Sequence, residues 1–323
     1  MLSRRLRVPA GIIVLLWLSG CASTPQSRAL FEQFDKPSSS PVIALASSVL
    51  LDRVPFFPQE AYQCGPAALA TVLQASRVSV TPDALVGQVY VPARQGSLQI
   101  EMLAAARAHG RIAHVLPADL PGVLKQLQAG EPVLVMQNLG LSWYPQWHYA
   151  VLVGYDLARR EVVLRSGLVR EYRMPMTVFE RTWQRAGHWA VVLLPPGQLP
   201  EDERENAYVQ SLADFSRQAD AAQMFAAYEV GLQRWPESRV LGMALANLHY
   251  AEGNRQAARM QYERVLRHAP DFAAAHNNLA QTLLELGELA LAHEHALTAV
   301  RLGGSFAASY ERTLDAVNAA LMP

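Results

Sequence analysis

The chain has 323 residues, with 28 Lys and Arg against 28 Asp and Glu. Apolar residues make up 51% and charged residues 17%, a composition that excludes disorder of the chain as a whole. Removing Arg4, Arg5 and Arg7 with the N-terminal segment leaves 25 basic residues against 28 acidic ones. This balance excludes the basic excess of a nucleic-acid-binding protein, and the length predicts roughly two domains.

The first 21 residues have the pattern of a secretory signal. Arginines precede an apolar run over 10–18, which is far shorter than the ~20 residues of a membrane-spanning helix. The run LSGC at 18–21 resembles the lipobox of bacterial lipoproteins, and the alternative is an ordinary signal peptide with a chance cysteine. The resemblance implies a lipid on Cys21 that anchors the chain to a membrane.

Two features follow from the residues after this cysteine. Ala22 stands where an Asp would be expected to retain a lipoprotein at the inner membrane. The resemblance therefore implies an outer-membrane lipoprotein that faces the periplasm. Residues 22–49 are rich in Ser, Pro and Ala, which predicts a flexible tether between the lipid and the first folded domain.

The chain has only two cysteines, Cys21 and Cys64. Two are too few for a disulfide framework or a cysteine-rich zinc site, and no metal or cofactor motif is visible. If Cys21 carries lipid, Cys64 is the one free thiol of an exported protein. Such a thiol is a hazard in an oxidising compartment unless it is buried or used, so Cys64 is a candidate functional residue.

Residues 50–196 have an α+β pattern, because predicted helices come first and predicted strands follow. A helix is expected to begin at Cys64, since Gly65 and Pro66 suit a first turn. The N–H groups and dipole of a helix N-terminus favour a thiolate and predict a lowered pKa for Cys64. Further helices are predicted over 82–89, 97–109 and 120–128, and strands over 132–137, 148–155, 161–165 and 189–194.

A nucleophilic cysteine needs a base, and four of the nine histidines lie in this region. His109 follows a predicted helix and His114 lies in a short extended run, so both are interpreted as structural. His188 precedes the last strand. His148 begins a strand after an aromatic loop, a position that can face a cleft. We therefore favour His148 as the base.

Five aromatic residues near the predicted strands are candidates for a substrate groove. The alternative for all five is packing in the core or the loops. Packing in the core is the favoured interpretation for the two tryptophans that follow. The candidates are Trp143, Tyr144, Trp147, Trp183 and Trp189.

Gln59, the run CGPAAL at 64–69 and the run HYAVLVG at 148–154 together resemble the papain-like cysteine peptidases that process double-glycine leader peptides. The resemblance covers about 52–196. It implies that Cys64 is the nucleophile, His148 the base and Gln59 an oxyanion-hole donor. Gln59 precedes the cysteine by five positions where six is usual, and Gln63 stands where the family usually has Asp.

The residue that orients His148 is the largest departure from the family. Asp156 is excluded because eight residues of strand place it roughly 26 Å away at ~3.3 Å per residue. A hairpin turn at 157–160 puts the strand partner of His148 near 169, so candidates lie at about 164–171. Ser166 is favoured, Glu171 is a second candidate, and the third possibility is that none of these residues orients the histidine.

The C-terminal third repeats with a period of 34 residues. Pro236 matches Pro270, and Gly253 matches Gly287. The pattern resembles tetratricopeptide repeats, which implies a concave surface for a peptide or a partner protein. A linker is expected at 197–205. Three repeats are expected at about 206–238, 240–272 and 274–306, followed by a capping helix at 307–320.

The predicted fold is therefore an α+β papain-like cysteine peptidase domain over 50–196 followed by an all-α tetratricopeptide-repeat domain over 206–320. Three hypotheses for its function remain. The first is a lipid-anchored cysteine peptidase whose repeats dock a substrate or partner. The second is a catalytically impaired adaptor that binds peptides or proteins in the same groove. The third, another Cys–His acyl-transfer enzyme, is disfavoured by the residues around Cys64.

Overall fold

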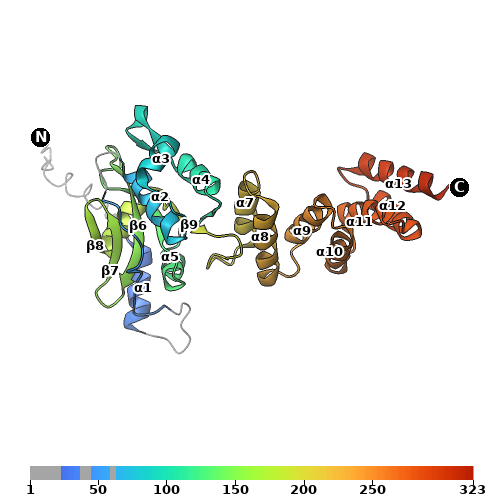
Figure 1. Cartoon of the computed structure of the whole chain (residues 1–323). Coiled ribbons are helices and arrows are strands. Elements are labelled where there is room, and N and C mark those ends of the chain that lie inside the picture. The colour runs from blue at the N-terminus through green and yellow to red at the C-terminus, as the bar shows by residue number, and fades with distance from the viewer. Residues whose placement is uncertain (1–22, 37–44, 59–62, 323) are drawn as a thin grey trace, which may run out of the picture.

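The computed structural model describes residues 23–36, 45–58 and 63–322. A mixed α+β domain comes first, and a series of helices extends away from it to the C-terminus (Figure 1). The predicted fold class is confirmed. None of the helices in the described ranges has the length and apolar composition that crossing a bilayer requires.

The α+β domain is built on one antiparallel sheet, to which seven strands contribute within the described ranges. The strands run in the order β4-β9-β5-β6-β7-β8, and β1 also pairs with β6. A separate small ladder joins β2 (Tyr90–Val91) to β3 (Gly96–Ser97). The strands of the large sheet are β1 (Ser48–Leu50), β4 (Ile112–Val115), β5 (Val133–Asn138), β6 (Trp147–Asp156), β7 (Glu161–Ser166), β8 (Val169–Pro175) and β9 (Ala190–Leu194).

Helices cover both faces of this sheet, because its central strands are apolar on both sides. One buried cluster joins α2 and α4 to Tyr149, Val151 and Val153 of β6. A second cluster on the other face joins α5 and α6 to Ala150 and Leu152 of the same strand. The helices of this domain are α1 (Pro25–Asp35), α2 (Cys64–Ala75), α3 (Pro82–Val89), α4 (Gln99–Ala108), α5 (Leu120–Gln128) and α6 (Met176–Gln184), with a 3₁₀ turn over Pro92–Arg94.

Part of the predicted tether over 22–49 is instead a docked helix. Leu30 and Phe31 of α1 are buried in the second cluster. The buried carboxylate of Glu180 on α6 accepts the backbone N–H groups of Gln26 and Ser27, at 3.0 and 2.7 Å. These bonds satisfy two of the N–H groups that a helix N-terminus leaves unpaired. The sequence pattern missed them because the capping residue lies more than 150 positions away.

The C-terminal region contains three antiparallel helix pairs and a final helix, an arrangement compatible with tetratricopeptide-like repeats. The tight turns of the last two pairs use Gly253 and Gly287, which have φ of +80° and +79°, a conformation that favours glycine. The first pair has a capping box at Asp220 instead. The helices are α7 (Glu205–Phe215), α8 (Ala221–Arg234), α9 (Arg239–Ala251), α10 (Arg255–His268), α11 (Ala273–Glu285), α12 (Leu289–Leu302) and α13 (Ala307–Leu321).

The junction between the two regions is packed rather than open. The second cluster continues from the sheet into α7 through Tyr208 and Phe215, and reaches α9 at Leu241. His114 of β4 is fully buried there, with Nδ1 2.9 Å from Ser211 Oγ of α7 and Nε2 3.0 Å from Asp202 Oδ2. Asp202 lies in the segment between β9 and α7, so this connecting segment is fixed against the α+β domain. His114 is therefore structural, as the sequence analysis interprets it.

Candidate active site

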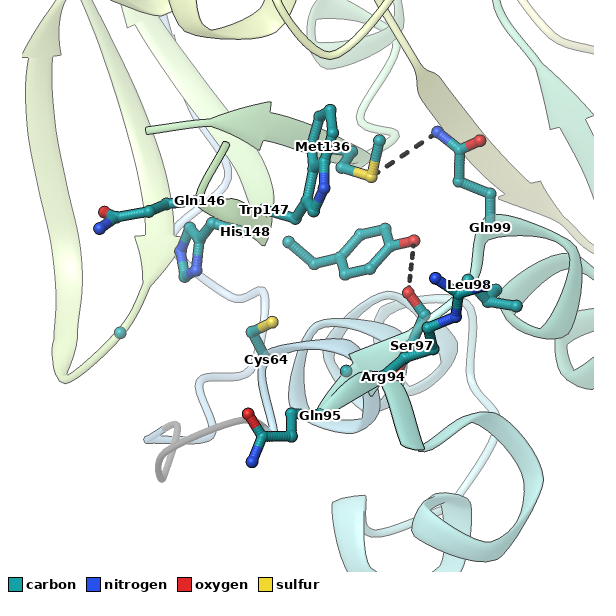
Figure 2. Close-up of a pocket in the computed structure, with 13 residues that line it drawn as sticks. Cys64, Arg94, Gln95, Ser97, Leu98, Gln99, Met136, Gln146, Trp147 and His148 are labelled. Atoms are coloured by element: carbon teal, nitrogen blue, oxygen red, sulfur yellow. Dashed lines mark hydrogen bonds between the residues drawn. The ribbon is translucent and has the colours of Figure 1, made fainter. Parts of the chain in front are cut away.

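A cleft of about 780 Å³ opens where the N-terminus of α2 meets the start of β6. Its walls come from four places in the sequence: Cys64, the turn and strand over 94–99, Met136 with 146–149, and Gly167. Figure 2 shows Cys64 between His148 on one side and Ser97 on the other. The fold therefore brings together the two residues that the sequence analysis selected as nucleophile and base.

Cys64 is the first residue of α2, as predicted. A Cβ on the next residue, Gly65, would lie 2.1 Å from Ser97 Oγ, so glycine is required for β3 to approach this helix. The approach encloses the thiol, and burial raises the pKa of Cys64. Hydrogen bonds from the backbone N–H groups of Tyr149, Gly65 and Cys64 itself act in the opposite direction but are weaker. The predicted lowering of this pKa is wrong, because burial outweighs the helix N-terminus.

His148 is the second residue of β6 and pairs with Gln137 of β5. Its Nε2 lies 2.8 Å from Ser166 Oγ at the end of β7. Burial lowers the pKa of His148. The imidazole is therefore neutral at neutral pH. In the tautomer that carries the ring proton on Nε2, this N–H donates a hydrogen bond to Ser166, and Nδ1 is the basic nitrogen.

The register of the β6–β7 hairpin brings Ser166 to His148. Asp156 pairs with Glu161 across the predicted turn, and a bulge between Leu152 and Gly154 then shifts the register by one residue. Continued to the strand ends, this register puts Ser166 opposite Ala150, diagonal to His148 and within side-chain reach.

The second candidate, Glu171, and the excluded Asp156 both lie elsewhere. Glu171 is on β8, beyond the turn at Gly167, and pairs with Arg173 at 3.4 Å. Asp156 is at the far end of β6, where its Oδ1 accepts the N–H of Arg159 at 2.9 Å. Neither carboxylate has a hydrogen bond to His148 in the described structure.

Two residues of the cleft were missed by the sequence analysis. Tyr149 directs its backbone N–H at the Cys64 sulfur and donates its hydroxyl to the Ser97 carbonyl oxygen at 3.3 Å. Ser97 belongs to β3, whereas the sequence analysis predicted a helix over 97–109 that begins at this residue. The structure starts that helix at Gln99. Gly65 was the available signal, since a glycine permits the close approach of Ser97.

The aromatic candidates separate into two groups. Trp183 is fully buried, and Trp189 packs edge-on against Tyr149, so both belong to the core as favoured. Trp147 lines the cleft, whereas Trp143 and Tyr144 are exposed on the loop that leads to it. Cys21 and Gln59 lie outside the described residues. The described residues contain no group of three or more His, Cys, Asp or Glu side chains that could hold a metal ion.

Comparison with known proteins agrees with this geometry. Residues 51–191 match the model of the Peptidase_C39 like family. The match supports a C39-like peptidase fold for the α+β domain. The match ends within β9, so it leaves out the C-terminal helices. No curated protein matches the chain.

Three solved structures are similar to parts of the chain. A Bacillus anthracis protein described as a C39-like peptidase is 20% identical, with 46% of this chain and 98% of that chain covered and a TM-score of 0.40. A double-glycine-motif protease from an AMS/PCAT transporter, in complex with the leader peptide, is 23% identical, with 45% and 93% covered and a TM-score of 0.34. The first TPR of Spaghetti (RPAP3), bound to an HSP90 peptide, is 14% identical, with 38% and 95% covered and a TM-score of 0.35. These TM-scores are too low to assign a function.

Proposed function

We propose that this protein is a cysteine peptidase that hydrolyses peptide bonds through Cys64 and His148. One observation carries the proposal: the C39-like domain holds a half-buried thiol and an imidazole at one cleft, with one ring nitrogen of the imidazole hydrogen-bonded to Ser166. A thiol, a base and a group that orients the base are the parts that nucleophilic catalysis requires.

Acylation begins with a neutral pair, because burial raises the pKa of Cys64 and lowers that of His148. As sulfur attacks the carbonyl carbon, the thiol proton passes to Nδ1 of His148. The C–N bond of the tetrahedral intermediate then breaks, and the imidazolium returns that proton to the leaving amine. The product is a thioester on Cys64. Ser166 keeps the ring oriented throughout, because its hydroxyl oxygen accepts a hydrogen bond from the N–H at Nε2.

Negative charge on the carbonyl oxygen needs donors in the transition state. Backbone N–H groups at the start of α2 are available for this role, and each donor of this kind contributes about 3 kcal/mol. The side-chain amide of Gln59 is proposed as a second donor, on the family resemblance. Deacylation then uses water: His148 takes a proton from it, the hydroxide attacks the thioester carbonyl, and the Cys64 thiol and a free carboxylic acid are released.

We also propose that the protein is an outer-membrane lipoprotein anchored through Cys21. The lipobox-like run LSGC at 18–21 supports this. Helix α1 begins at Pro25, only four residues after Cys21, and is docked on α6. The anchor would then hold the α1 side of the domain close to the membrane. Mass spectrometry of the purified protein tests the lipid: Cys21→Ala should lack it and should leave the membrane fraction.

The helical region is proposed as the docking site for a substrate or partner protein. Its three helix pairs and final helix form a stack of the kind that presents extended binding surfaces. Its packed junction with the C39-like domain would hold a docked protein at a set position relative to the cleft. Pull-down with the full chain and with a variant altered on the exposed faces of α9 and α11 tests this role.

The peptidase activity is tested by alkylation. The full-length protein is treated with iodoacetamide for increasing times, and cleavage of denatured casein is measured as new amino termini. We expect activity to fall in proportion to the alkylated fraction of Cys64, since this is the only cysteine besides Cys21. Absence of cleavage before alkylation, in a folded protein, would contradict the proposal and leave the adaptor hypothesis. The alkylation of Cys64→Ala serves as the blank.

A further inference from the structure

The loop that leads into the active site displays large apolar side chains to solvent. We call residues 139–146 the aromatic loop. Trp143 and Tyr144 are 80% and 65% exposed, and Leu141 is 55% exposed. Leu168, at the tip of the β7–β8 hairpin beside Ser166, is 76% exposed. Neither the loop nor the turn at 167–169 contains a charged residue. Exposed apolar surface of this kind marks a binding site rather than ordinary surface.

The aromatic loop is held rigidly. Buried Asn138 accepts the backbone N–H groups of Gly140 and Gln146 on its Oδ1, both at 3.0 Å. Leu141 and Tyr144 exchange two backbone hydrogen bonds at 3.1 Å. A Cβ on Gly140 would lie 2.4 Å from the Tyr144 carbonyl oxygen, so the turn closes only with glycine there. The backbone that carries the aromatic side chains is therefore fixed, which reduces the entropy cost of binding.

The chemistry assigns a side of the cleft to this surface. His148 protonates the leaving amine, so the segment after the scissile bond must lie against His148. Figure 2 shows Gln146 next to His148, on the side of Cys64 away from Ser97 and Leu98. Gln146 is the last residue of the aromatic loop, and Gly167, at the hairpin tip, also lines the cleft. The residues of a bound peptide that follow the scissile bond would therefore lie along the aromatic loop and the hairpin tip.

We propose that the aromatic loop and the tip at 167–169 bind the leaving-group segment of the substrate, so that the peptidase selects peptides with apolar residues after the scissile bond. This inference rests on the proposed function. The occupant is an apolar peptide segment, because the surface is continuous with the catalytic cleft and lacks charge.

A peptide library made by cutting a bacterial proteome with trypsin tests the inference. The full-length protein cleaves the library, and mass spectrometry identifies the residues on both sides of each new cut. We expect apolar residues to be enriched about fivefold in the first four positions after the cut, and the double variant Trp143→Ala/Tyr144→Ala to abolish this enrichment. Phe34→Ala is the control, since Phe34 is an exposed aromatic residue on α1 that does not line the cleft.

The outcomes separate the inference from the proposed function. Cleavage with no preference after the cut, or with a preference that the double variant retains, overturns the inference and leaves the peptidase. If no cleavage depends on Cys64, the proposed function fails. Binding then decides: peptides from the library are captured on Cys64→Ala and on the triple variant Cys64→Ala/Trp143→Ala/Tyr144→Ala. Apolar peptides captured by Cys64→Ala and not by the triple variant support the docking surface, and equal capture by both overturns it. A double variant that alters only self-association, or only binding to phospholipid vesicles, also overturns the inference.

Discussion

Two histidines on the same sheet differ in their exposure and in their partners. Burial lowers the pKa of both His148 and His114. His148 has one neutral partner, Ser166, and lines an open cleft. His114 has hydrogen-bond partners at both ring nitrogens, Ser211 and Asp202, and no exposure at all. A buried histidine therefore becomes a candidate base only where one nitrogen stays available on an accessible side.

The largest effect is expected at the accessible histidine and its thiol. Cys64→Ala and His148→Ala should each reduce kcat/KM by about a thousandfold or more, because neither the nucleophile nor the proton carrier has a substitute in the cleft. The assay is cleavage of a peptide taken from the library. Thermal unfolding should remain close to that of the wild type, and a variant that retains activity would contradict the assignment.

The enclosed histidine should affect stability instead. Asp202→Ala leaves the buried ring of His114 without its acidic partner and should reduce the free energy of unfolding by about 2–4 kcal/mol. The activity of the folded fraction should be unchanged within about twofold. Urea unfolding followed by circular dichroism measures the first quantity. If Asp202→Ala lost activity without losing stability, the comparison between the two histidines would fail.

The pH dependence of this variant gives a second check. Hydrogen bonds from Arg204 and His114 outweigh burial and lower the pKa of Asp202 to about 2. A lowered carboxylate pKa stabilises the fold above the unfolded pKa of ~3.9, and this contribution is lost as pH falls towards 2. The neutral form of buried His114 adds a loss that begins below about pH 6.5. Because Asp202 raises the pKa of His114, the loss that His114 causes remains in Asp202→Ala. The wild type should therefore lose stability more steeply than Asp202→Ala only between about pH 4 and pH 2, where Asp202 becomes protonated.

Ser166 permits a smaller and more specific change. Ser166→Ala removes the acceptor for Nε2 of His148 and should lower kcat/KM by about tenfold through a poorly oriented ring. Ser166→Asp should restore orientation and raise the pKa of His148, since an adjacent carboxylate favours the charged imidazole.

The pH profile of kcat/KM distinguishes these roles. Activity requires neutral His148 and is lost as pH falls through its pKa. The acid limb of the wild type should lie below the ordinary value of ~6.5, because burial lowers this pKa. In Ser166→Asp the limb should move to higher pH. An unmoved limb in this variant would show that Ser166 does not contact the catalytic ring.

The smallest effect is expected at Asp156. This carboxylate caps the β6–β7 turn through the N–H of Arg159, at the opposite end of β6 from His148. Asp156→Ala should change kcat/KM by less than about twofold. Steady-state kinetics with the same peptide checks this, with Ser166→Ala as the comparison. A loss as large as that of Ser166→Ala would contradict the register of the hairpin.

Much of the site was predictable because its pieces depend on local patterns. The helix start at Cys64 follows from the Gly and Pro after it, and the turn at 157–160 follows from the two apolar strands on either side. Ser166 was one of three alternatives, because a bulge in β6 shifts the register by a residue and no sequence signal marks it. The aromatic loop was visible in the sequence, but its rigidity depends on the hydrogen bonds of Asn138.

The sequence by itself determined the α+β class of the first domain, its helices α2 to α5 and its strands β5, β6, β7 and β9. It also determined the thiol and histidine and the 34-residue period of the C-terminal helices. Only the tertiary structure decided how segments far apart in the chain meet. Glu180 caps α1 and replaces a predicted tether with a docked helix, and β3 encloses Cys64 so that its pKa rises instead of falling. Local patterns depend on neighbouring residues, whereas burial and its effect on charge depend on distant segments that pack against them.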